Sequence, residues 1–293
     1  MSELALLERE QDWLTRAEAH RDRAERFLQP HRQRMAAGQA HPVWDFLFTY
    51  YSLRPRQLVR WHPGFGVVLA GAEAQRRYLG KTGYVAHADG VTVGTDYLQA
   101  RLETVGFIAD LLRATAARPA QLNCFGMHEW AMVYRTDAAR HTQVPLRLGQ
   151  TGTDRVVDNA GPLRCSHYDA FRFFTADAVP RNSTVLTRDT QVQREQPGCV
   201  HANMDLYKWC YKLGPLAESG LLLDCLDLAA EARELDMRAS PYDLSDYGYP
   251  PIRVEQPAGR AEYVRCQSDL AQRAAPLRAA LQRRCDLLLA AAA

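Results

Sequence analysis

In LRCSHYDAFRFFTADAVPRN (residues 163–182) and PGCVHANMDLYKW (residues 197–209), titratable side chains alternate with large aromatic rings. A plain core segment would be apolar, and a plain surface segment would lack the aromatic residues. Polar groups that move protons or hold a metal, set among aromatic rings, are typical of a buried reactive pocket. We therefore expect the chemistry of this protein here. The reactive side chains are Cys165, His167, Asp169, Arg172, His201, Asn203, Asp205 and Lys208.

The second segment leads into a helix that we expect over residues 202–214. Helical spacing places Leu206 and Trp209 on one face and Asp205 and Lys208 on another. Lysine is rare in this chain, which otherwise uses arginine. Lys208 therefore either belongs to an ordinary solvated charge row or marks a position where an amine is needed.

The fold around these segments is predicted to be mainly α (α+β). Helical apolar spacing predicts helices over residues 3–36, 96–117, 216–239 and 259–289, with interruptions at Pro30 and Pro276. Short strands are expected over residues 66–71 and 84–93, the second folded into a hairpin at Ala88-Asp89-Gly90. We expect a single helical domain over residues 1–293, comprising an N-terminal surface helix (1–38), a small β-hairpin element and a catalytic or binding core (41–289).

Three remaining segments are less regular. Trp44, Phe48 and Tyr51 have helical spacing, which predicts a core helix or, alternatively, a wall of stacking surfaces. Pro119 predicts the start of another helix, which would carry His128 and Glu129. Residues 138–165 are expected to form loops and short strands.

Composition narrows the class of protein. The chain has 293 residues, of which 47% are hydrophobic and 24% charged, as is ordinary for a globular protein. Its formal net charge of +2 argues neither for nor against nucleic acid. The seven cysteines form no CxxC pair, so neither a disulfide framework nor a zinc knuckle is indicated. Without a signal-peptide pattern or a membrane-spanning apolar run, we expect a cytoplasmic protein with no membrane partner.

One interpretation of the reactive residues is base-releasing chemistry. A carboxylate in an aromatic pocket can activate water or stabilise the sugar cation that forms as a glycosidic bond breaks. Asp169 or Glu129 would be the catalytic carboxylate, with His167 and His128 as proton donors and no cofactor. The candidate substrate-binding residues are Asp45, Trp61, His62, Trp130, Arg172, Asn203, Asp205 and Lys208.

The alternative is a metal-dependent enzyme that acts on a small metabolite. His167, Asp169 and His201 would form a site with two histidines and one carboxylate for iron or zinc, with His128 or Glu129 as a further candidate ligand. This ligand set requires residues 167 and 169 to lie on a strand, where both project from one face. In a third interpretation the pocket only binds a small molecule or a protein. The oligomeric state is left open by the sequence.

Several longer strings add a family resemblance. The chain resembles a bacterial family commonly labelled 3-methyladenine DNA glycosylase, from about His41 to the last helix. That resemblance implies DNA as a partner and release of alkylated purines by hydrolysis of the N-glycosidic bond. The chain lacks the motifs of the helix-hairpin-helix and alkyladenine types of glycosylase, so no catalytic residue is carried over from either. The strings are HPVWDFLFTYYSLRP, RWHPGFGVVL, GMHEWAMVYR, RCSHYDAFRFFT, PGCVHANMDLYKW and ELDMRASPYDL.

Overall fold

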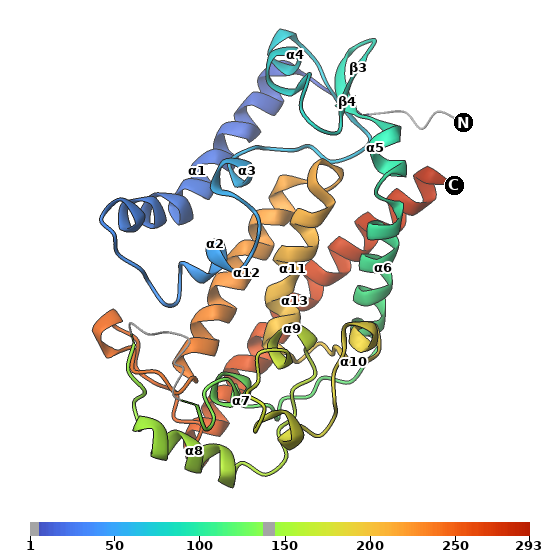
Figure 1. Cartoon of the computed structure of the whole chain (residues 1–293). Coiled ribbons are helices and arrows are strands. Elements are labelled where there is room, and N and C mark those ends of the chain that lie inside the picture. The colour runs from blue at the N-terminus through green and yellow to red at the C-terminus, as the bar shows by residue number, and fades with distance from the viewer. Residues whose placement is uncertain (1–5, 137–143) are drawn as a thin grey trace.

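Long helices form the body of the protein in the computed structural model, which describes residues 6–136 and 144–293. Helices α11 (Val200–Leu213) and α12 (Ser219–Arg238) pack against each other, and α13 (Pro257–Ala292) packs along both (Figure 1). Helix α6 (Leu102–Ala116) lies beside α13. Nearly every side chain of α11 is buried, so this helix is the centre of the fold. The mainly helical class with a small β element is confirmed.

The two central helices are separated by a short break with a clear local cause. Gly214 ends α11 with a φ of +59°, a conformation that glycine adopts readily, and Pro215 follows it. The helices predicted over residues 202–214 and 216–239 are therefore confirmed within a few residues.

The small sheet contains the predicted hairpin. Strands β3 (Tyr84–His87) and β4 (Gly90–Val93) pair antiparallel, and β4 also pairs antiparallel with β2 (Val67–Leu69). Strand β1 (Leu6–Glu8) completes the order β1-β2-β4-β3 and runs parallel to β2. The prediction of helix from residue 3 is thus wrong for residues 6–8, whose backbone pairs with β2.

Both long terminal helices continue through their prolines, which corrects the predicted interruptions. Helix α1 (Glu10–Ala36) contains Pro30, and α13 contains Pro276. An internal proline removes one helical hydrogen bond. Buried side chains on both sides of each proline, such as Leu28 and His31 in α1, hold the two halves against the core.

Elsewhere the helices are shorter than predicted. The aromatic segment after residue 41 forms two short turns, α2 (Phe46–Thr49) and α3 (Pro55–Leu58). The helix predicted over residues 96–117 is divided into α5 (Thr95–Gln99) and α6. Residues 119–126 are not helical, because left-handed backbone at Phe125 and Gly126 places the start of α7 (Met127–Ala131) after them.

The region between α7 and α11 holds helices that the sequence pattern did not indicate. Helix α8 (Gly149–Asn159) lies where loops and short strands were expected, and residues 138–143 of that prediction fall outside the described residues.

The remaining helices are short and lie in several parts of the chain. They are α4 (Ala72–Tyr78), α9 (Tyr168–Phe171), α10 (Gln191–Arg194) and the 3-10 turns Val179–Arg181, Arg188–Thr190, Gly214–Leu216 and Ser245–Tyr247.

The larger of two hydrophobic clusters among the described residues runs from Trp13 in α1 to Leu288 in α13. The smaller one includes Val43, Val133 and Tyr242. Within the described residues, no helix is both long and apolar enough to cross a membrane.

Candidate active site

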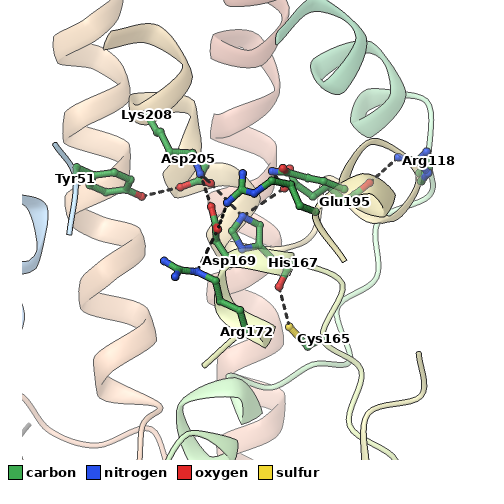
Figure 2. Close-up of polar contacts among 11 residues, drawn as sticks. Tyr51, Arg118, Cys165, His167, Asp169, Arg172, Glu195, Asp205 and Lys208 are labelled. Carbon is green, nitrogen blue, oxygen red and sulfur yellow. Dashed lines mark hydrogen bonds and ion pairs between the residues drawn. The ribbon is translucent and has the colours of Figure 1, made fainter. Parts of the chain in front are cut away.

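Helix α11 presents a row of ionisable groups toward the short helix α9. Asp205 Oδ2 lies 3.1 Å from His167 Nε2, and the ammonium of Lys208 bonds the same carboxylate. Lys208 Nζ also donates to Asp169 Oδ2 at 2.9 Å (Figure 2). Tyr51 donates its hydroxyl to the other oxygen of Asp205, at 3.0 Å. Four side chains that the sequence singled out are thus joined in one network.

The charges of this network stabilise one another. Burial opposes ionisation of Asp205, but Lys208 and His167 outweigh it and hold the pKa of Asp205 well below its usual range. Burial also disfavours the ammonium of Lys208, yet the two carboxylates raise the pKa of Lys208. The pKa of Asp169 is lowered, since Lys208 outweighs the effect of burial. At neutral pH both carboxylates and the ammonium are therefore charged.

A second buried cluster lies directly beside the first. His128 Nε2 of α7 is 2.6 Å from Asp236 Oδ1 of α12, and His201 Nε2 of α11 is 3.8 Å from Asp236 Oδ2. Arg233, one turn before Asp236, places Nη1 3.2 Å from Asp236 Oδ2 and 3.0 Å from Glu129 Oε1. The His201 ring stacks on His167 with ring centroids 5.4 Å apart, which connects the two clusters.

This second cluster has the geometry of a metal-ligand set. One candidate ligand atom from each of His128, His201 and Asp236 lies within 4.8 Å of the others, and all three residues are buried. Within the described parts of the chain, the imidazole of His201 makes no hydrogen bond, and its nearest carboxylate is that of Asp236, at 3.8 Å. Burial, with His128 nearby, lowers the pKa of His201 to about 3, so its ring is neutral and its nitrogen lone pair is available at neutral pH.

The other two members of the cluster are electrostatically complementary. Burial disfavours a protonated His128, but the adjacent Asp236 carboxylate outweighs it and raises the pKa of His128. Burial also disfavours an ionised Asp236, whereas His128 and His201 hold the pKa of Asp236 well below its usual range. A bound cation would take the place of the proton that His128 and Asp236 share.

A small cavity opens beside this cluster. We call it the inner pocket; its volume is about 170 Å³. His201, Glu129 and Arg233 form its polar wall. Its other lining residues are Phe46, Tyr50, Met132, Asp169, Ala170 and Phe173.

A larger cavity, which we call the outer pocket, adjoins the inner one. Its volume is about 680 Å³, and Tyr50 and Asp169 line both pockets. The outer pocket carries the cationic groups of Arg172, Arg188 and Lys212. A small molecule placed across Tyr50 and Asp169 would reach the His201 ring at one end and these cations at the other.

The predicted ligand set of His167, Asp169 and His201 needs correction. Residues 167 and 169 do not share a strand face, because His167 caps α9 and Asp169 lies within its first turn. Asp169 is paired with Lys208 instead. The structure groups His201 with His128, which the sequence offered only as a further candidate ligand, and with Asp236, which it did not offer.

Several predicted site residues lie at the two pockets. The predicted catalytic carboxylates Glu129 and Asp169 and the predicted metal ligand His201 line the inner pocket. Asp169, Arg172 and Lys208 line the outer one. His128, His167 and Asp205 lie directly behind these walls, in the two buried clusters.

Five other predicted substrate-binding residues lie outside both pockets and both clusters, and have structural contacts. Asp45 pairs with His31 and Arg34, and Trp61 stacks on Trp13. The other contacts are His62 Nδ1 with the Tyr84 hydroxyl, Trp130 Nε1 with the Ala239 carbonyl, and Asn203 with Arg278 and the Pro197 carbonyl.

Sequence reasoning did not select Asp236 or Arg233 as site residues, and it included Tyr50 only in the aromatic segment offered as a wall of stacking surfaces. Asp236 and Arg233 are three positions apart and fully buried in α12. A pair of opposite charges on the apolar face of a predicted core helix is a signal that could have indicated them.

The comparisons with known proteins add no identification. No family model, no curated protein and no solved structure matches this chain. The resemblance to the family labelled as DNA glycosylases therefore stays a prediction.

Proposed function

We propose that this protein is a metal-dependent enzyme that acts on a small molecule bound in the inner pocket. The observation that carries this proposal is the convergence of His128, His201 and Asp236, with His201 also lining the pocket. A cation held by these three side chains would lie at the cavity wall, where a substrate can reach it.

The donor set fits zinc or ferrous iron. Two imidazoles and one carboxylate leave coordination positions open for water or substrate in both zinc and non-haem iron enzymes. Arg233, which donates to Asp236, would orient the ligating carboxylate, as partners outside the ligand shell do in metal sites. When bound, such an ion would supply Lewis acidity or, in the case of iron, reactivity with dioxygen.

Glu129 is the candidate general base. Its carboxylate lines the inner pocket and is fixed by Arg233 at 3.0 Å, beside the ligand His128. A carboxylate held at this position can accept a proton from a water or substrate hydroxyl in the pocket. Phe46, Tyr50 and Phe173 provide aromatic surface in the same cavity.

Elemental analysis tests the metal proposal. The protein is purified without a metal-binding tag, and zinc and iron are measured per chain before and after anaerobic addition of Zn²⁺ or Fe²⁺. We expect about one ion per chain, and a melting temperature that rises with added ion because the ion binds only the folded state. The melting temperature is measured on the wild-type protein, so this test does not depend on the folding of any variant.

Matched variants locate the ion. His128→Ala/His201→Ala is expected to lose the stoichiometric ion, whereas His87→Ala, at an exposed position in β3, is expected to retain it. The proposal is overturned by a wild-type protein that binds neither ion, or by a folded double variant that still binds one per chain.

Release of an alkylated purine from DNA is the second candidate function. It is supported by the two carboxylates Glu129 and Asp169 on an aromatic cavity, together with the sequence resemblance. This function needs no metal and predicts duplex binding that weakens steeply with salt. It also predicts that chelators leave base release unchanged and that Asp169→Asn abolishes it.

A further inference from the structure

The outer pocket has a charge distribution suited to a small anion. Arg172 and Arg188 each lie 3.3 Å from Asp169 Oδ1, and the two arginine side chains are 42% and 64% exposed. Lys212 is exposed and forms no ion pair with any residue that the structure describes. These three cations are therefore only partly neutralised by protein groups.

Lys208 differs from these cations, because its charge is already balanced. Its ammonium is buried and bonds both Asp169 and Asp205. Asp169 in turn meets Lys208 through Oδ2 and the arginines through Oδ1. An anion entering the outer pocket would thus compete with one carboxylate oxygen for Arg172 and Arg188, without disturbing the buried pair.

The junction between the pockets suits a flat apolar group. Tyr50 lines both pockets and stacks on Phe46, with ring centroids 4.6 Å apart. Phe173 lines the inner pocket, and Arg172 lies over its ring at 4.0 Å. An aromatic ring in the inner pocket would therefore lie next to the cation that binds its anionic substituent.

We propose that the substrate is a small aromatic anion, a phosphate monoester or carboxylate, whose ring occupies the inner pocket and whose charge is bound by Arg172, Arg188 and Lys212. The proposal rests on the proposed function in one respect: the metal site at His201 decides which end of the substrate reacts.

The experiment measures binding to chelator-treated protein, so it is independent of whether a metal binds. Phenyl phosphate, benzoate and the neutral analogue phenol are titrated by ligand-observed NMR. We expect either anion to bind at least about tenfold more tightly than phenol, equivalent to 1.4 kcal/mol. The preference should shrink as NaCl is raised, since the cations are exposed.

Paired variants locate the binding. Arg172→Gln/Arg188→Gln, with folding checked by circular dichroism, is expected to remove the preference for the anions over phenol. Arg273→Gln, an equally exposed arginine on α13, is expected to preserve it. Equal binding of phenol and the anions, no binding of any probe, or an unchanged preference in the double variant would overturn the proposal.

A competition experiment distinguishes a small phosphate ester from the phosphates of DNA. A short duplex oligonucleotide is added as competitor against phenyl phosphate. We expect little displacement at equal phosphate concentration. Displacement by the duplex that exceeds displacement by unlabelled phenyl phosphate would overturn the small-molecule assignment and favour DNA. If the protein binds no metal but still prefers the anions, only the proposed metal-dependent reaction is overturned. If it binds metal but does not prefer the anions, only the proposed substrate class is overturned.

Discussion

Lys208 Nζ of α11 donates to Asp169 Oδ2 of α9 at 2.9 Å, and this buried pair separates the surface cations from the interior histidines. The same ammonium bonds Asp205, so one cation balances two carboxylates drawn from different helices. This arrangement links the wall of both pockets to the centre of the core.

Removing the ammonium is expected to destabilise the fold strongly. Lys208→Met leaves Asp205 fully buried without its main partner, and breaking a buried pair in this way costs about 3–5 kcal/mol. Urea unfolding measures the loss. Lys212→Met, on the same helix but exposed, is the matched control and should change the free energy of unfolding by less than about 0.5 kcal/mol. Equal effects of the two substitutions would contradict the assignment.

Stability should also depend on pH through Asp205. Its folded-state pKa is depressed, so its contribution is fully present above the unfolded pKa of about 4 and is lost as the pH falls toward the folded value. We expect the urea midpoint of the wild type to fall between about pH 5 and pH 3, and Asp205→Asn to fall less steeply. Asp246→Asn, at an exposed position, should keep the wild-type slope. A wild-type slope in Asp205→Asn would argue against this role.

Asp169 should compete with anionic ligands. Asp169→Asn removes the negative charge that Arg172 and Arg188 now face at 3.3 Å. We therefore expect phenyl phosphate to bind at least about twofold more tightly, in line with the energy of partly exposed ion pairs. Asp177→Asn, an exposed aspartate that lines neither pocket, should leave the affinity unchanged. Weaker binding to Asp169→Asn would contradict this competition.

The start of α13 requires a glycine at position 259. A Cβ at Gly259 would lie 2.0 Å from the Arg253 carbonyl oxygen, so the backbone of residue 253 must move if Gly259→Ala is introduced. We expect a loss of at least about 1 kcal/mol, as for other overpacked positions. Gly106→Ala in α6 has no atom within 4 Å of its Cβ and should instead stabilise by about 0.5–1 kcal/mol. Thermal unfolding of both variants compares them; effects of the same sign would contradict the reasoning.

Local sequence patterns were enough for α11, α12 and the hairpin of β3 and β4. Each depends on contacts between residues close in the chain: helical apolar spacing, the Gly214-Pro215 break, and a tight turn. The same patterns overestimated the effect of Pro30 and Pro276, because packing of α1 and α13 against the core offsets one lost hydrogen bond.

The candidate site was predicted only in part, because sequence patterns relate residues that are close in the chain. The sequence alone determined a mainly helical protein with a small hairpin. It identified Asp169, Asp205 and Lys208 as members of a polar cluster among aromatic rings, and it named Glu129 as the alternative catalytic carboxylate. It paired His167 with Asp169 because they are neighbours in the chain. Only the tertiary structure decided that Asp236, and not Asp169, joins His128 and His201. These three residues are far apart in the chain, and burial of apolar surface brings their helices together.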